Sequence, residues 1–241
     1  MISSGVLTYA SIVEQIGDFE RTDSFSIECW VYPTSGKINE DIISKFTYAI
    51  GYRFVSHSTR GKVNGLEVGL YSNESNKAVV VISGALGLPI NTWQHYVVTY
   101  NGSSSTSGIK IYVNGTSRAL LVAANNLTNT IKTIEPFKIG TGYYPFYGGK
   151  IDEVCIYSRV LSASEVTQRY NAGVGTENLF GSSYAHYLLN ESSGSSVSDS
   201  SGNGRNLSTI GNPSWVVGKL NNCVQLNGSS QYITGQILYW Y

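Results

Sequence analysis

The chain has 241 residues, of which 41% are hydrophobic, 12% are aromatic and only 13% are charged, against about 25% charged residues in an average soluble protein. Its 16 basic and 16 acidic side chains cancel, and no run of like charge stands out, so the sequence gives no support for nucleic-acid binding, which concentrates Lys and Arg on one face. No apolar stretch approaches the roughly 18 residues of a transmembrane helix, so we expect no membrane insertion.

Alternation of apolar and polar residues recurs along the chain and predicts β-strands with one buried face. The first clear strand, residues 25–32, places four side chains on one face: Phe25, Ile27, Cys29 and Val31. Further strands are predicted at 40–46, 48–55, 65–71, 77–83, 93–100, 109–115, 137–140 and 150–158. After a linker or crossing loop at 173–183, strands resume at 184–189, 215–217, 222–226 and 231–234.

One short helix is predicted at 163–171. Ser162 and Glu165 have the spacing of a capping box, Val166 and Tyr170 form an apolar pair one turn apart, and Gly173 would supply the left-handed stop. The helix is therefore expected as an appendage to a β protein.

Three cysteines, Cys29, Cys155 and Cys223, lie at wide spacing inside apolar strand patterns. We expect buried free thiols that pack as small hydrophobic groups. One disulfide with one free thiol is the alternative that the sequence leaves open.

Several segments together resemble the laminin-G-like members of the concanavalin A-like lectin/glucanase superfamily. They are SFSIECWVYP (24–33), DIISK (41–45), NTWQHYVVTYNG (91–102), IKIYVNG (109–115), FKIGTG (137–142) and GGKIDEVCIYSRVLSASEV (148–166). The resemblance implies an all-β fold, an antiparallel two-sheet jelly-roll sandwich.

The segment that normally opens such a domain resembles residues 184–234, which here come last. We divide the chain into a sandwich body at 1–172, the linker or crossing loop at 173–183 and displaced opening strands at 184–241. The displaced strands either complete the same sandwich, within the chain or an oligomer, or begin a following repeat. A likeness between 5–17 and VQLNGSSQYITGQ favours the repeat, whereas the strand edges that a half-sandwich exposes favour completion, which we prefer.

Glucan hydrolases of this superfamily carry paired carboxylates on one strand, at the spacing Glu-x-Asp-x-x-Glu. The candidate pair here is Asp152-Glu153, and adjacent strand residues are expected to point to opposite faces. We therefore expect no enzyme activity, and glycoside hydrolysis is the least favoured function.

Calcium is the cofactor that the sequence suggests. The turn at 199–204 offers oxygen ligands from Asp199 and Asn203, and the resemblance implies that Asp152 or Glu153 could complete a structural Ca²⁺ site. The alternative is a turn in which Asp199 and Asn203 bond their own backbone.

The densest aromatic loop is GTGYYPFYGG, with Tyr143, Tyr144, Phe146 and Tyr147, and Trp30 could add to a ligand-binding surface. The alternative is that these rings fill the core. A non-catalytic lectin-like module that binds glycan or a surface protein is the predicted function.

The alternative function is a virion decoration, fibre or other structural protein that assembles with copies of itself or with particle neighbours. The first residues, MISSGVLTYA, show no signal-peptide pattern, and the last, ILYWY, are apolar enough to need burial or a partner. We expect an extracellular or virion-surface location.

Overall fold

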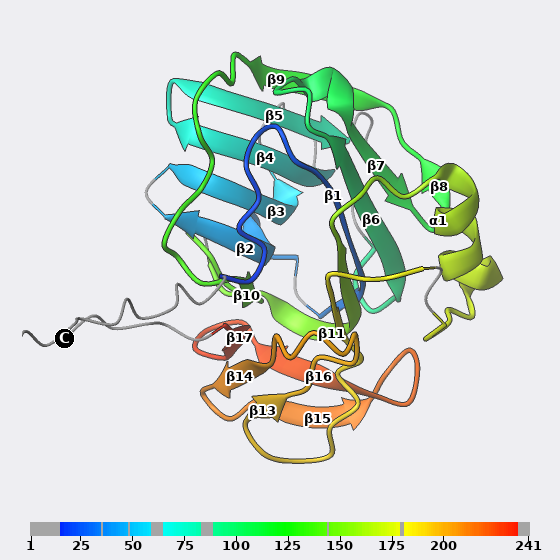
Figure 1. Ribbon diagram of the computed structural model, residues 1–241. Coiled ribbons are helices and arrows are strands. Elements are labelled where there is room, and N and C mark those ends of the chain that lie inside the picture. Colours follow the sequence, from blue (N-terminus) through cyan, green and yellow to red (C-terminus); the bar gives the residue numbers. More distant parts are fainter. Residues whose placement is uncertain are drawn as a thin grey trace, which may run out of the picture.

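Two antiparallel sheets pack face to face in the computed structural model of the chain (Figure 1). The structure describes residues 15–34, 36–47, 49–58, 65–82, 89–143, 145–178 and 181–235. The predicted all-β sandwich with one short helix is confirmed. The apolar end at 237–241 lies outside the described residues.

The first sheet, called sheet A, has the strand order β15-β16-β11-β1-β6-β7-β8, and β12 also pairs with β11. Its strands are β1 (Ser24–Pro33), β6 (Gln94–Asn101), β7 (Ile109–Val113), β8 (Thr116–Ser117), β11 (Gly148–Tyr157), β12 (Ala185–Tyr187), β15 (Ser214–Val217) and β16 (Asn222–Asn227).

The second sheet, called sheet B, has the order β13-β14-β17-β10-β2-β3-β4-β5-β9. Its strands are β2 (Glu40–Thr47), β3 (Ile50–Ser58), β4 (Gly65–Asn73), β5 (Asn76–Ile82), β9 (Leu120–Asn125), β10 (Lys138–Ile139), β13 (Ser196–Val197), β14 (Leu207–Ile210) and β17 (Tyr232–Thr234). Strands β8, β9, β13 and β14 were not predicted. Strand β9 lies at a sheet edge and none of its residues is buried, so it carries no burial alternation to recognise.

The core fills the space between the sheets with the side chains that the alternation predicts. All four apolar residues of the inner face of β1 belong to it: Phe25, Ile27, Cys29 and Val31. The three thiols are free and buried, which confirms that prediction, and burial raises the pKa of the Cys223 thiol to about 12. Thiols held neutral in this way are chemically inert.

Strands from the last part of the chain hydrogen bond directly to strands of the preceding part. Strand β16 pairs with β11, placing Val224 opposite Ile151, and β17 pairs with β10, placing Ile233 opposite Ile139. The orange and red strands therefore extend both sheets at the bottom of Figure 1. The division of the chain at 172 and 183, and the origin of the last segment as displaced strands or a repeat, stay predictions.

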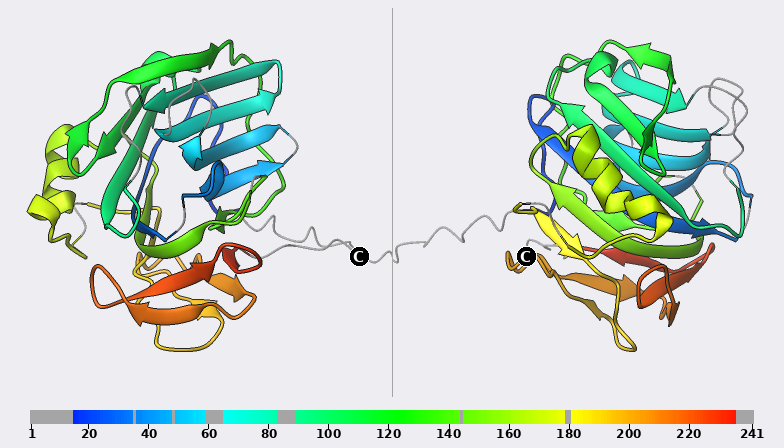
Figure 2. Two further views of the ribbon diagram at one scale, coloured as in Figure 1. Left: turned by 180° about the vertical axis from the view of Figure 1, so that it is seen from behind. Right: turned by 90° about the vertical axis from the view of Figure 1, so that its right-hand side faces the viewer.

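Helix α1 (Ala163–Tyr170) lies across the outer face of sheet A (Figure 2). The predicted capping box is present, because Ser162 Oγ accepts from Glu165 N at 3.2 Å and Glu165 Oε2 accepts from Ser162 N at 2.8 Å. The stop comes earlier than predicted. Asn171 adopts the left-handed conformation, φ 46°, which Asn tolerates better than most residues, and Gly173 closes a following 3₁₀ turn instead. No helix in the described ranges is long and apolar enough to cross a membrane.

A buried ionic network fixes α1 to the sheet. Arg169 Nε lies 2.6 Å from Glu28 Oε1 on β1, and Arg169 Nη2 lies 3.8 Å from Glu153 Oε2 on β11. His95 Nε2 is 3.3 Å from Glu28 Oε2, and His186 Nε2 is 3.1 Å from Glu153 Oε2. None of these five side chains is more than 3% exposed. Charges this deep in a protein are tolerated only when they are paired.

Replacing Arg169 by Met should lower the free energy of unfolding by about 3–5 kcal/mol, because two buried carboxylates lose their cation. Arg159→Met is the matched control. Arg159 pairs with Glu165 at 2.6 Å near the start of the same helix, but its side chain is 37% exposed, so its loss should cost about 1 kcal/mol or less. Denaturant unfolding measures both variants, and equal losses would contradict the role given to the buried network.

Acid should destabilise the fold through Glu28. Burial alone would raise the pKa of this carboxyl, but the Arg169 guanidinium and His95 hold it below the ordinary value of 4.5. A group with a lowered pKa stabilises the folded state above its unfolded-chain pKa and loses that contribution as the pH falls through the folded value. Urea unfolding at decreasing pH should therefore show that the difference in unfolding free energy between wild type and Glu28→Gln shrinks below pH 4.5. A difference in unfolding free energy that stays constant into the acid range would contradict the role given to the Glu28 carboxylate.

Candidate functional site

The residues predicted to hold calcium are engaged with the protein's own backbone. Asp199 Oδ1 accepts from the backbone N–H of His186 at 2.9 Å and of Ser201 at 3.0 Å, and Asp199 Oδ2 accepts from Arg205 N–H at 3.0 Å. Burial alone would raise the pKa of the Asp199 carboxyl, but these hydrogen bonds hold that pKa below the ordinary value. Asn203 Nδ2 donates to two backbone carbonyls, each at 3.1 Å.

Asp152, the third predicted ligand, lies against a different loop. Its Oδ2 accepts from the backbone N–H groups of Lys219 at 2.8 Å and Leu220 at 3.0 Å. Within the described ranges, no three or more His, Cys, Asp or Glu side chains gather as a metal would need. A structural calcium at Asp199, Asn203 and Asp152 stays a prediction.

The expectation that Asp152 and Glu153 point to opposite faces is wrong. The register between β1 and β11 shifts after Glu28, and Glu153 has a φ of 50°, which makes a β-bulge. Ile151 and Val154 both enter the core, so the two acidic residues between them share the outer face. Both carboxylic residues are at most 1% exposed and already bonded, so the pair offers a substrate no open carboxylate.

The predicted ligand-binding aromatic residues, Trp30 on β1 and those of the loop between β10 and β11, do not form one open surface. Trp30 is 3% exposed, covered by Tyr170 with ring centroids 5.8 Å apart and by Lys219, whose Nζ is 4.7 Å from the ring. Tyr147 is fully buried in the core. Neither ring therefore presents an open face to a ligand.

The rest of the aromatic loop is split between two neighbours. Tyr143 is 61% exposed and meets Phe46 of sheet B edge-on, with centroids 6.0 Å apart. Phe146 is half-buried beside Tyr232 of β17 at 6.0 Å. Tyr144 lies outside the described residues. Tyr143 and Phe146 keep accessible surface, and their role in ligand binding stays a prediction.

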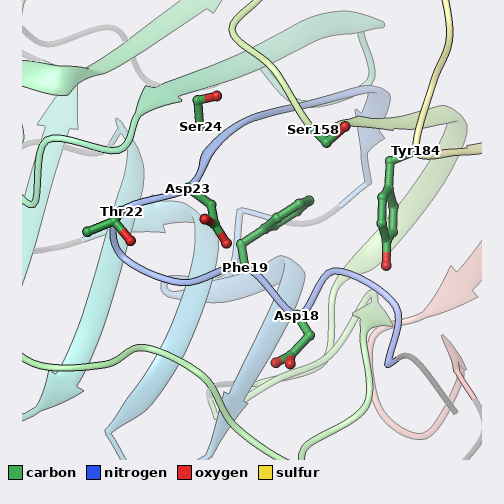
Figure 3. Close-up of a pocket in the computed structure, with 7 residues that line it drawn as sticks. All are labelled: Asp18, Phe19, Thr22, Asp23, Ser24, Ser158 and Tyr184. Carbon is green, nitrogen blue, oxygen red and sulfur yellow. The ribbon is translucent and has the colours of Figure 1, made fainter. Parts of the chain in front are cut away.

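A cavity of about 500 Å³ opens where the segment before β1 passes the end of β11 and the start of β12 (Figure 3). Its walls combine two carboxylates, three hydroxyls and two aromatic rings: Asp18, Asp23, Thr22, Ser24, Ser158, Phe19 and Tyr184. These residues come from three separate parts of the sequence. None of the seven is among the site residues predicted from the sequence, since nothing local indicates that Ser158 and Tyr184 approach residues 18–24.

Phe19 anchors the segment that forms most of the cavity. Its ring stacks on Phe25 of β1 at 4.7 Å and lies 6.4 Å from Tyr52 of β3, so it contacts both sheets. The turn before it depends on Gly17, which has a φ of 68° and whose carbonyl accepts from Tyr52 Oη at 3.0 Å. The deep-blue segment ahead of β1 in Figure 1 is thereby held over the gap between the sheets.

Tyr184 forms the facing wall and is fixed on several sides. Its ring lies 5.5 Å from Phe19, and the Arg205 guanidinium lies 3.9 Å from its centroid. Its backbone N–H donates to Ile156 O on β11 at 2.7 Å. Figure 3 shows the two rings with Asp23 close to Phe19. The aromatic part of the cavity is therefore formed before any ligand arrives.

Several polar groups that line the cavity form no hydrogen bond with the described residues. The side-chain hydroxyls of Thr22, Ser24 and Ser158 take part in no hydrogen bond with the described residues, and Asp18 Oδ1 is enclosed without a hydrogen-bond partner among them. The second oxygen, Asp18 Oδ2, lies 3.5 Å from Lys132 Nζ, and Asp23 Oδ2 accepts from Glu20 N–H at 2.8 Å. A concave aromatic wall with a few free polar groups is the usual make-up of a small-ligand site.

The sequence matches a known family over most of its length. A sequence model of the concanavalin A-like lectin/glucanases superfamily matches residues 5–167. The chain belongs to this superfamily. The match confirms the resemblance seen in the segments between residues 24 and 166. It begins ahead of the first of these segments and ends before residue 184. None of the curated proteins matches the chain.

Solved structures share the fold. A candidate carbohydrate-binding protein from Bacteroides ovatus is 19% identical, with a TM-score of 0.56 over 94% of this chain and 57% of its own. The chain therefore spans little more than half of that structure. Domain 4 of an extracellular arabinanase from Geobacillus stearothermophilus, in complex with arabinotriose, is 18% identical, with a TM-score of 0.46 over 62% of this chain and 68% of its own. At these identities the likeness shows the fold alone.

Substituting Gly17 by Ala should disturb the cavity more than a comparable change elsewhere. A Cβ at Gly17 would overlap Tyr52 Oη, in addition to the strain of φ 68°. Gly202→Ala is the matched control, since its φ is 85° but nothing lies within 4 Å. We expect the control to lose about 1–2 kcal/mol of unfolding free energy, the cost of a left-handed alanine, and Gly17→Ala to lose clearly more. Equal losses in denaturant unfolding would show that the Tyr52 contact does not constrain this turn.

Proposed function

We propose that the chain is a non-catalytic module that binds glycan in the cavity between Phe19 and Tyr184. The observation that carries the proposal is the set of uncommitted hydroxyls and carboxylate oxygens around two fixed aromatic rings. Sugar hydroxyls both donate and accept hydrogen bonds, which suits serine, threonine and aspartate side chains. The apolar faces of a sugar ring can pack on aromatic side chains that already sit in place.

The superfamily of the chain and one similar solved structure support the proposal. Lectins belong to the superfamily of this chain, and the similar Bacteroides ovatus structure is described as carbohydrate binding. We propose the outside of a cell or particle as the location, because glycans are displayed there. The partner is then a glycan or a glycosylated surface protein.

The non-catalytic part of the proposal rests on the carboxylates. Hydrolysis of a glycosidic bond requires two carboxyl groups that face the same sugar, one of them as a proton donor. The adjacent pair Asp152-Glu153 is buried and bonded to the protein. Asp23 in the cavity has one oxygen occupied by Glu20 N–H. Burial raises the pKa of both Asp152 and Glu153, that of Asp152 to about 8, but neither carboxyl reaches the surface, so neither can pass a proton to a bound sugar.

Glycan-array binding followed by calorimetry tests the proposal. Tyr184→Leu should weaken binding of the selected glycan about twofold to twelvefold, because an aromatic contact contributes about 0.5–1.5 kcal/mol beyond its area. Thr22→Ala, at an exposed position, should weaken it by a similar factor through one lost hydrogen bond. Tyr143→Leu is the matched control, an exposed aromatic residue in the loop between β10 and β11.

Denaturant unfolding should show that the weakened variants remain folded. Loss of binding in Tyr143→Leu alone would move the site to the aromatic loop. Binding to no glycan would overturn the proposed function. Release of sugar products by wild type but not by Asp23→Asn would contradict its non-catalytic part.

A further inference from the structure

The turn at residues 199–205 holds Tyr184 from outside the cavity. The Arg205 guanidinium carbon lies 3.9 Å from the centroid of the Tyr184 ring, and Arg205 Nη1 donates to Tyr184 O at 3.1 Å. Asn203 Nδ2 donates to the same carbonyl and to Ser183 O, each at 3.1 Å. One turn of the chain therefore contacts Tyr184 both at its ring and at its backbone.

This turn is itself fixed to the core. Asp199 Oδ1 accepts from His186 N–H at 2.9 Å, and Asp199 Oδ2 accepts from Arg205 N–H at 3.0 Å. Tyr187, which is fully buried in the core, donates from its Oη to Arg205 O at 2.8 Å. The backbone of Arg205 is thus bonded at its N–H and at its carbonyl, so the side chain presents its guanidinium to Tyr184 from a rigid base.

Arg205 acts on the cavity through Tyr184. Tyr184 forms part of the cavity wall, whereas Arg205 is half-buried and does not line the cavity (Figure 3). Because the guanidinium covers one face of the Tyr184 ring, a ligand meets only the ring surface that Arg205 leaves uncovered. A cation over an aromatic face is attracted by the ring quadrupole, more strongly where water is partly excluded.

We infer that the turn at 199–205 sets the affinity of the cavity for glycan, with Arg205 as the positioning residue of Tyr184. The inference rests on the proposed function and adds how that site is controlled. A sugar that packs on a mobile side chain must order it, and the ordering reduces the net binding free energy. The guanidinium holds the Tyr184 ring where it lines the cavity, so the sugar meets a ring that is already ordered.

Calorimetry with a double-mutant cycle tests the inference. The probes are cellotriose, maltotriose, the trimer of N-acetylglucosamine and the glycan that binds wild type most tightly on the array, and the tightest of these is used with the variants. Arg205→Met removes the cation and its donors but keeps an unbranched side chain. It should weaken binding about twofold to twelvefold, the ordering cost of one side chain. In the Tyr184→Leu background the same change should leave binding nearly unchanged, because the ring that Arg205 holds is gone.

Two further variants separate positioning from a general loss of structure. Arg205→Lys keeps a cation for the ring and should retain more affinity than Arg205→Met. Arg118→Met is the matched control, because Arg118 is half-buried like Arg205 but follows β8 at an edge of sheet A and lies outside the cavity lining. The control should bind as wild type does, and denaturant unfolding should show that every variant is folded.

The contact between Arg205 and Tyr184 can be measured without glycan. In wild type the ring current of Tyr184 should move the NMR resonance of the Arg205 Nε proton upfield, and Tyr184→Leu should return it to its ordinary position. A resonance at the ordinary position in wild type would overturn the contact on which the inference depends.

The outcomes separate the two proposals. Equal binding by wild type and Arg205→Met overturns the inference and leaves glycan binding in place. A loss of equal size in the Tyr184→Leu background shows that Arg205 contacts the sugar itself, which overturns its positioning role. Arg205→Lys binding no tighter than Arg205→Met overturns the role given to the cation. No binding of any glycan by wild type overturns the proposed function, and the inference with it.

Discussion

Arg169, in the last turn of helix α1, pairs with both Glu28 and Glu153, and none of the three side chains is more than 3% exposed. Its Nη1 also donates to the carbonyls of Thr176 and Asn178, at 2.8 and 2.9 Å. One guanidinium thus joins β1, β11, the helix and the segment that follows it. A buried ion pair of this kind adds little to stability when intact, but it is costly to break.

The same network reaches the candidate site through β12. His186 contacts Glu153 through its ring and Asp199 through its backbone N–H, which fixes the short strand on the edge of sheet A. Tyr184 lies two residues earlier and forms one wall of the cavity. Phe19 reaches the opposite wall from the segment before β1, where it contacts both sheets. The cavity is therefore built on the rigid sandwich, which keeps its polar groups in place for a ligand.

Much of the fold follows from local patterns in the sequence. Alternation identified the inner face of β1, the spacing of Ser162 and Glu165 identified the start of α1, and the apolar surroundings of the cysteines identified buried thiols. Each of these signals acts over a few residues, where strand and helix periodicity decide which side is buried.

Features that depend on distant contacts could not be predicted in this way. The bulge at Glu153 places a residue other than glycine in the left-handed region, which the partners Arg169 and His186 stabilise from far along the chain. The aromatic loop looked like a ligand platform, yet its Tyr147 fills the core. The cavity joins residues 18–24 to Ser158 and Tyr184, and no spacing in the sequence signals that approach.

Mapping a bound glycan by NMR tests the central claim most directly. Titration of the isotope-labelled protein with the tightest glycan from the array should shift the backbone amides of 18–24 and those of Ser158 and Tyr184. The amide resonances of residues near Tyr143 and Trp30 should not shift. Shifts that gather around Tyr143 and Phe146, with the 18–24 segment unchanged, would contradict the account and place the site on the aromatic loop.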